Sequence, residues 1–190
     1  MEQNHYNKEF SDINYSEQQL RGKVFEQCTF LNCDFSYNDL SDAEFIDCTF
    51  NRCGFIMTIV KHTGLKNVSF VNSKLAGVDF GQCATFCFGI NGTSSEFRSC
   101  SFYKQRMRKT SFNDCLVKEC YFSDCDLTES LFLNSNLDSS QFEKCILDKV
   151  NFSTSNGYLI DPELNRMKKT KFSKYGLEGL LFKYDLIIEE

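Results

Sequence analysis

The sequence predicts a repeat solenoid, in which the chain coils around a long axis, and three observations indicate it. Every fifth residue from Leu20 to Phe80 is apolar, and the same spacing returns two residues out of phase from Phe97 to Phe152. A second ladder of small or thiol-bearing residues lies two positions before the first, and residues twenty apart match in kind. A period of five fits neither an α-helix, with about 3.6 residues per turn, nor a strand, with a period of two, so the chain must coil.

The two ladders combine into recurring five-residue units. Examples are Cys33-Asp34-Phe35, Val78-Asp79-Phe80, Cys125-Asp126-Leu127 and Ser135-Asn136-Leu137. These units resemble those of the pentapeptide-repeat family, which read roughly Ala/Cys/Ser, Asp/Asn, Leu/Phe and two free residues, and the resemblance covers about residues 10–152. It implies an all-β fold, a right-handed quadrilateral β-helix with a four-unit turn. The recurrence of similar residues twenty positions apart supports that turn length independently.

The apolar ladder is dominated by phenylalanine and is our candidate core. Its phenylalanines include Phe25, Phe30, Phe35, Phe45, Phe50, Phe55, Phe102, Phe112, Phe122, Phe132, Phe142 and Phe152. Rings twenty residues apart are expected to stack along the axis at the inter-strand spacing of about 4.8 Å. About seven coils at that rise make a rod about 34 Å long.

The eleven cysteines follow the core pattern, because nine of them lie two residues before a ladder residue. Pairs twenty apart, such as Cys28 with Cys48, would stack on adjacent coils at a Cα separation inside the disulfide range. Parallel side chains in a reducing cytosol nevertheless favour free, structural thiols. A spacing of five also places successive thiols on different sides of the coil, which argues against a zinc site. The alternative, a local redox or metal pair, applies to Cys83 and Cys87 in the irregular stretch.

The ladder slips within residues 81–96. Seventeen residues separate Phe80 from Phe97, so a two-residue insertion must bulge outward, and Gly89 and Gly92 are the expected turn-formers. A structural irregularity is the simpler interpretation, and a functional loop is the alternative.

A basic cluster follows the slip. It consists of Lys104, Arg106, Arg108 and Lys109, all outward by the ladder. Four charges without interleaved exposed aromatic residues are weak support for nucleic-acid contact, so we expect none.

Negative charge is concentrated in the N-terminal coils. Residues 1–51 carry ten acidic and three basic side chains, whereas the whole chain has a net charge of -5 and residues 97–190 are neutral. The candidate acidic partner surface consists of Asp34, Asp39, Asp42, Glu44 and Asp47. A solvated solenoid face is the alternative.

The repeat pattern ends after Phe152. We therefore expect a β-helix over residues 1–156 and a helical capping and dimerisation segment over residues 157–190. Asp161 followed by Pro162 is typical of an N-cap and a first helical residue, and a second amphipathic segment follows. The candidate dimer interface consists of Leu177, Leu180, Leu181, Tyr184, Leu186, Ile187 and Ile188. Capping without dimerisation is the alternative.

From Gly176 the tail reads Gly-Leu-Glu-Gly-Leu-Leu-Phe-Lys-Tyr-Asp-Leu-Ile-Ile. It resembles the dimerisation segment of the Qnr-type quinolone-resistance proteins and the related microcin immunity proteins. In that subgroup two β-helices join tail to tail into an acidic rod that mimics DNA and binds DNA gyrase or topoisomerase IV. The resemblance implies a homodimer that protects such an enzyme from quinolones or a peptide toxin, with no cofactor and no direct contact to nucleic acid or membrane.

The competing function is a non-catalytic structural or protein-interaction scaffold with no topoisomerase role. An enzyme is the least favoured class, because the two histidines, His5 and His62, are far apart and no nucleophile motif or phosphate-binding glycine loop is found. We expect His5 to be a solvated terminal residue and His62 to point outward. The mean hydropathy of -0.35 and the lack of a long apolar run argue against a signal peptide or a membrane span, which predicts a cytoplasmic protein.

Overall fold

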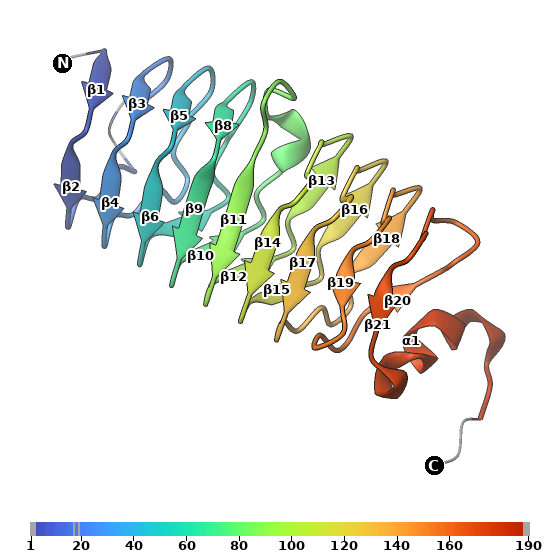
Figure 1. Ribbon diagram of the computed structural model, residues 1–190. Coiled ribbons are helices and arrows are strands. Elements are labelled where there is room, and N and C mark those ends of the chain that lie inside the picture. Colours follow the sequence, from blue (N-terminus) through green and yellow to red (C-terminus); the bar gives the residue numbers. More distant parts are fainter. Residues whose placement is uncertain (1–2, 17, 19, 188–190) are drawn as a thin grey trace.

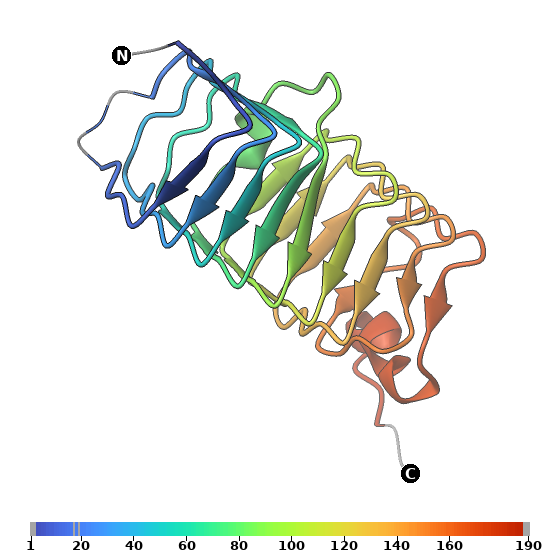
Figure 2. The same ribbon diagram turned by 60° about the vertical axis from the view of Figure 1, so that its left-hand side comes forward.

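The computed structural model describes residues 3–16, 18 and 20–187, which wind into a four-sided rod with the two ends of the chain at opposite ends (Figures 1 and 2). The described residues make about eight turns of an all-parallel solenoid, against the about seven expected. Strands on adjacent turns pair in register twenty residues apart, as Phe30 does with Phe50. The fold is the right-handed quadrilateral β-helix that the repeat predicts.

The described strands form four sheets, which we name faces A to D in the order in which the chain visits them. Face A contains β1 (Asn4–Tyr6), β3 (Val24–Glu26), β5 (Glu44–Ile46) and β8 (Gly64–Lys66). Face B contains β2 (Glu9–Ser11), β4 (Thr29–Leu31), β6 (Thr49–Asn51), β9 (Val68–Val71), β11 (Ile90–Thr93), β14 (Ser111–Asn113), β17 (Leu131–Leu133), β19 (Asn151–Phe152) and β21 (Lys171–Phe172). Face C contains β7 (Gly54–Ile56), β10 (Lys74–Ala76), β12 (Glu96–Arg98) and β15 (Leu116–Lys118). Face D contains β13 (Ser101–Tyr103), β16 (Tyr121–Ser123), β18 (Gln141–Glu143) and β20 (Leu159–Ile160).

The twelve phenylalanines expected in the core are all buried. Rings on adjacent turns lie in near-parallel stacks, with centroids 4.8 Å apart for Phe30 and Phe50 and 4.6 Å apart for Phe102 and Phe122. Rings from neighbouring faces of one coil meet edge to face, as Phe50 does with Phe55 at 5.1 Å. Both arrangements are ones that aromatic quadrupoles favour, so the rod interior is a continuous aromatic core.

The small residues that lie two positions before each ring in the sequence form hydrogen bonds to the preceding coil. Ser135 Oγ donates to the carbonyl oxygen of Phe112 at 3.0 Å, and Cys48 Sγ makes the corresponding contact with Phe25 at 3.3 Å. All eleven cysteines are free and ten are buried, the exception being Cys87. Burial raises the pKa of the Cys48 thiol to about 12, so this group remains protonated and behaves as a small apolar side chain.

All four corners of a regular coil are turned by residues in the left-handed conformation, such as Gln27, Asn32, Tyr37 and Asp42 in one coil. Asparagine, aspartate and glycine reach this region at least cost. Longer side chains such as Arg52 also adopt it here.

The expected two-residue insertion lies near the middle of the rod, after a 3-10 helix, η1 (Phe80–Gln82), and projects as a loop (Figure 1). Register changes from twenty to twenty-two residues, so Leu75 pairs with Phe97. The expectation that Gly89 and Gly92 form the turn is wrong: the left-handed turn residue is Cys87. An exposed loop residue can take that conformation, and Gly92 is needed in the core instead.

Gly92 lies inside β11, between Phe70 of the preceding coil and Phe112 of the following one. It leaves a gap in the ring column, and Phe97 fills it edge-on, with centroids 6.0 Å from Phe70 and 5.1 Å from Phe112. A Cβ at Gly92 would lie 2.8 Å from the Phe97 ring, which explains the glycine. The break is therefore a repacked junction between two phases of one core.

The chain continues the solenoid beyond residue 156, since β20 and β21 pair with β18 and β19. The helix expected to begin at Asp161 does not form. Asp161 Oδ1 instead accepts from the Glu163 backbone N–H at 2.9 Å in a tight turn, and Arg166 then pairs with Ile146 of the previous coil. Pairing with the edge of the previous coil stabilises this segment more than the capping signal of Asp161 and Pro162 would stabilise a helix. The division at residue 156 stays a prediction.

The chain then leaves the solenoid through short helical segments that lie across its end (Figure 1). They are η2 (Lys174–Gly176), α1 (Glu178–Leu181) and η3 (Phe182–Tyr184). At the opposite end, the expectation for His5 is wrong. Its ring stacks on Phe25 with centroids 4.8 Å apart, because residue 5 continues the five-residue ladder and adds a ring to the first coil.

Candidate functional site

The five acidic residues of the candidate partner surface lie on one coil and are all exposed, but they do not share a face. Asp34 pairs with Gly54 on face C, and Asp39 pairs with Ile59 on face D. Glu44 lies in β5 on face A. Asp42 and Asp47 stand at the corners before and after it. Because thirteen residues of a twenty-residue turn separate the first from the last, they wrap around the rod.

Several of these carboxylates have local partners. Asp42 contacts Arg21 at 3.1 Å and His62 Nδ1 at 3.4 Å, so the outward histidine belongs to this cluster. Asp47 accepts from Asn67 Nδ2 at 2.6 Å. Hydrogen bonds from Ser41 hold the pKa of Asp39 below its usual range, which keeps that exposed carboxylate charged.

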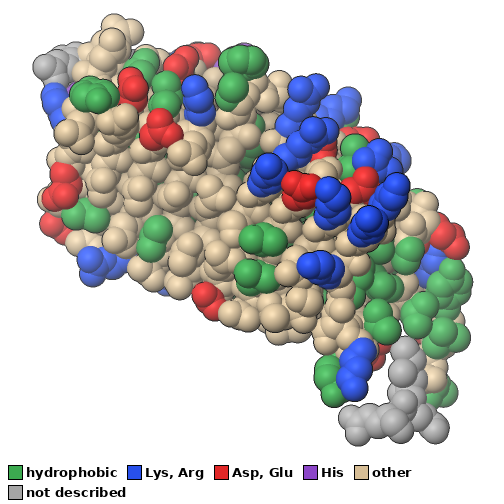
Figure 3. Space-filling model, in the orientation of Figure 1, with side chains coloured by type: hydrophobic (Ala, Val, Ile, Leu, Met, Phe, Trp, Pro, Cys, Tyr) green, Lys and Arg blue, Asp and Glu red, His purple; other side chains and the backbone are tan. Residues whose placement is uncertain are grey.

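The structure brings the basic cluster at 104–109 together with later basic residues that sequence reasoning did not connect to it. Face A continues past the break as residues 105–109, 125–129, 145–149 and 165–169, which pair by isolated bridges. We call this surface the basic face, and its cations gather over the later coils in Figure 3. They are Lys104, Arg106, Arg108, Lys109, Lys144, Lys149, Arg166, Lys168 and Lys169. Writing the sequence in twenty-residue rows would have aligned them.

Carboxylates on the basic face lie beneath its guanidinium groups. Arg108 pairs with Asp126 and Arg166 with Asp148, both at 2.6 Å. The two carboxylate side chains are 13% and 16% exposed, whereas the arginines are 67% and 64% exposed. Burial alone would raise the pKa of Asp126, but hydrogen bonds from Thr128 and Arg108 outweigh it and lower that pKa. A partner at this face therefore meets mainly positive charge.

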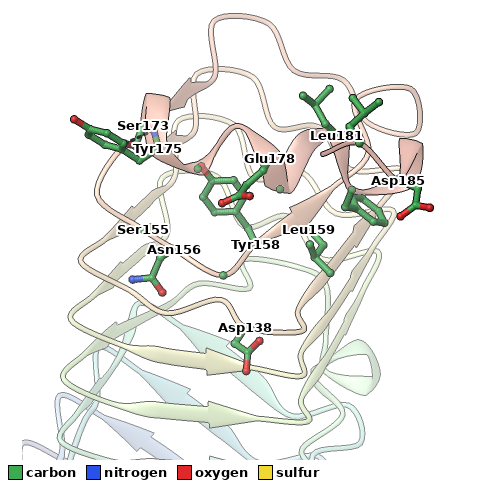
Figure 4. Close-up of a pocket in the computed structure, with 15 residues that line it drawn as sticks. Asp138, Ser155, Asn156, Tyr158, Leu159, Ser173, Tyr175, Glu178, Leu181 and Asp185 are labelled. Atoms are coloured by element: carbon green, nitrogen blue, oxygen red, sulfur yellow. Dashed lines mark hydrogen bonds between the residues drawn. The ribbon is translucent and has the colours of Figure 1, made fainter. Parts of the chain in front are cut away.

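The tail is held on the last coils by Tyr158 and by one ion-pair cluster. A Cβ at Gly176 or Gly179 would collide with Tyr158, so only glycine lets the helical turns lie this close to it (Figure 4). Lys183 Nζ lies 2.9 Å from Asp161 and 2.7 Å from Glu163. A groove of about 610 Å³ remains between the tail and the last coils.

The candidate dimer interface is mostly exposed. Leu177, Leu181, Tyr184, Leu186 and Ile187 all face solvent, and Ile187 is 92% exposed. Leu180 instead packs partly against the core. Ile188 lies outside the described residues. Exposed neighbours that the sequence did not single out are Leu159, Tyr175 and Phe182.

In the irregular stretch, Cys83 is buried and Cys87 is exposed. Burial is the larger cause of the raised pKa of the Cys83 thiol, and the negative charge of Asp79 raises that pKa further. Among residues 3–16, 18 and 20–187, no three His, Cys, Asp or Glu side chains converge as metal ligands would. Within the same residues, no helix has the length and apolarity needed to cross a bilayer.

The family model for pentapeptide repeats matches residues 19–52 and 118–156, with eight copies. The two matched stretches lie within the four-sided parallel coil, so the chain carries pentapeptide repeats in a fold of the kind that such repeats form. Proteins of this family are generally structural or interaction scaffolds rather than enzymes.

Solved structures show which fold within this class the chain shares. A trypsin-treated variant of QnrB1, a plasmid-mediated fluoroquinolone resistance protein, gives a TM-score of 0.63 at 20% identity, covering 98% of this chain and 100% of that chain. Full-length QnrB1 gives 0.47 at 17% identity, with 96% and 100% covered. HetL, a pentapeptide repeat protein involved in heterocyst differentiation regulation from the cyanobacterium Nostoc, gives 0.46 at 8% identity, with 90% and 85% covered. The chain has a Qnr-like fold. No curated protein matches its sequence.

Proposed function

We propose that this protein is a non-catalytic, cytoplasmic, DNA-mimicking rod that binds DNA gyrase or topoisomerase IV and protects it from quinolones or a peptide toxin. The observation that carries the proposal is the correspondence of fold with QnrB1 over nearly the whole of both chains, the tail included. QnrB1 is a fluoroquinolone resistance protein, and the same fold here supports the same class of role.

The physical basis is a rigid rod with an acidic end. Stacked rings and inter-coil hydrogen bonds hold the coils in one geometry, so carboxylates on the surface keep fixed positions without an ordering cost on binding. The N-terminal coils carry the net negative charge of the chain. A rigid acidic surface of this kind complements a basic groove built to bind DNA.

Dimerisation through the tail is part of the proposal. Several large apolar side chains are exposed together at the end of the rod, around a groove of about 610 Å³. A contiguous apolar surface of this kind is typical of an interface. A second copy placed tail to tail would cover it and leave the acidic ends distal.

The experiment is a gyrase supercoiling assay, with and without a quinolone, in which the purified protein is titrated. Restored supercoiling in the presence of the drug, or inhibition in its absence, supports the proposal. No effect up to a large molar excess contradicts it.

A scaffold with another protein partner is the second candidate. The observation that favours it is that the five acidic candidates wrap around three faces of one coil rather than forming one DNA-like row. Capture of a stable partner other than a topoisomerase, together with inactivity in the supercoiling assay, would support this candidate.

A further inference from the structure

Four large apolar side chains lie at or beside the corner between faces C and D of the N-terminal half. Tyr37, Ile56, Met57 and Ile59 are 70%, 42%, 58% and 50% exposed. They lie on adjacent coils: the Tyr37 backbone N–H donates to the Ile56 carbonyl oxygen at 2.8 Å, and Ile59 pairs with Asp39. The Met57 side chain extends over Gly77 on the next coil. We call this surface the apolar corner.

The rod contains its own comparison for this corner. After the insertion, the same position along the coil is occupied by Ser99, Glu119 and Ser139, all in the left-handed conformation. The backbone N–H groups of Ser99 and Glu119 donate to the next coil as those of Tyr37 and Met57 do. Polar residues therefore turn the corner equally well. The apolar side chains at the N-terminal half are not required by the coil.

The backbone at the apolar corner adds a second observation. Tyr37 (φ 59°) and Met57 (φ 51°) both occupy the left-handed region. Other corners adopt the same conformation with charged or polar residues, such as Arg52, Lys104 and Glu119. The backbone therefore does not require an apolar side chain at this corner, and asparagine would adopt the conformation at least cost.

Carboxylates border the apolar corner. Asp34 and Asp39 flank Tyr37 on its own coil, and Asp79 follows Ile59 on the next coil. Asp34 and Asp39 are both exposed, and hydrogen bonds from Ser41 keep the pKa of Asp39 low. An aromatic and a methionine side chain within a charged border have the composition of a protein-binding surface, in which a few large side chains dominate the affinity.

We propose that the apolar corner is the contact through which the protein docks on its topoisomerase, and that it fits a basic protein surface containing an apolar pocket. This inference rests on the proposed function and adds the contact face to it. A DNA-binding enzyme supplies such a partner, because Lys and Arg side chains that hold phosphates line its nucleic-acid groove. Tyr37 and Met57 are the anchors, and Asp34 and Asp39 select a basic surface.

The test is a binding measurement with immobilised gyrase and the full chain. The double variant Tyr37→Asn, Met57→Asn removes both anchors and places a residue type favoured in the left-handed conformation at each position. The matched control is Glu119→Asn, Ser139→Asn, at the same corner beyond the insertion. We expect the double variant to bind about tenfold or more weakly, with an unchanged or raised melting temperature, and the control to bind as the wild type does.

The possible results separate the two proposals. If the wild type does not bind gyrase, the proposed function fails, and this contact face fails with it. If the wild type and the double variant bind equally, only the contact face is overturned. If the double variant keeps its gyrase affinity but changes particle mass in light scattering, the occupant is a second copy, and the topoisomerase contact is likewise overturned.

Discussion

The two halves of the rod share one backbone but differ in their outer surfaces. Before the insertion, the corner between faces C and D is apolar and bordered by carboxylates. After it, the same corner is polar, and face A carries nine basic and four acidic side chains over four coils, counting its two corners. In a solenoid the inward ladder determines the coil, which leaves outward positions free to vary. The surfaces, rather than the fold, therefore distinguish the functions of the halves.

The core of the two halves differs in aromatic content, and we expect the removal of one core ring to have the largest effect. Phe50 contacts five neighbouring rings, whereas Phe122 contacts three. We expect Phe50→Ala to lower the free energy of unfolding by about 3–5 kcal/mol, because the stacked rings cannot collapse into the cavity. Phe122→Ala should cost less within the same range. Denaturant unfolding of both variants measures this, and an unchanged midpoint for Phe50→Ala would contradict its packing role.

Two apolar surfaces, one in each half, are proposed to have different partners. Replacing Leu181 and Ile187 by Asp should give monomers, because each new carboxylate would lose hydration in a tail-to-tail interface. The matched control is Ile59→Asp at the apolar corner, which should remain dimeric. Light scattering measures both particle masses. A tail variant that keeps the wild-type mass would leave the tail with a capping role alone.

The junction between the halves depends on one missing side chain. We expect Gly92→Ala to cost about 1–3 kcal/mol through overpacking, because its Cβ would lie 2.8 Å from the Phe97 ring and 3.1 Å from Cys115 Sγ. Gly89→Ala is the control, since its nearest neighbour would lie at 3.4 Å. Thermal unfolding compares the two. Equal melting temperatures would show that Phe97 moves freely in the gap.

The fold could be predicted because the residues that build it repeat at a fixed period, and each ring identifies its own inward position. The surfaces could not be predicted in the same way. Tyr37 and Met57 occupy free positions of separate five-residue units, and only the twenty-residue register makes them neighbours. The helix expected at Asp161 failed for a related reason: local capping signals do not report the strand edge of the previous coil, with which Arg166 pairs.

We expect the smallest effect from removing one carboxylate of an ion pair, compared between the two halves. Asp126 has a lowered pKa in the folded state, so it contributes stability at pH values above its unfolded pKa of about 3.9. That contribution is lost as the pH falls through the folded pKa. Asp126→Asn should therefore lower the melting temperature at pH 7, and its difference from the wild type should shrink below pH 4.

The control is Asp42→Asn in the N-terminal half. Asp42 and its partner Arg21 are both about half exposed, so their pair should contribute only about 0–1 kcal/mol. Melting curves of both variants across the acid range give the comparison. If the two variants behave alike at every pH, the carboxylates beneath the basic face are no more stabilising than an open surface pair, and their role is limited to shaping the charge that a partner meets.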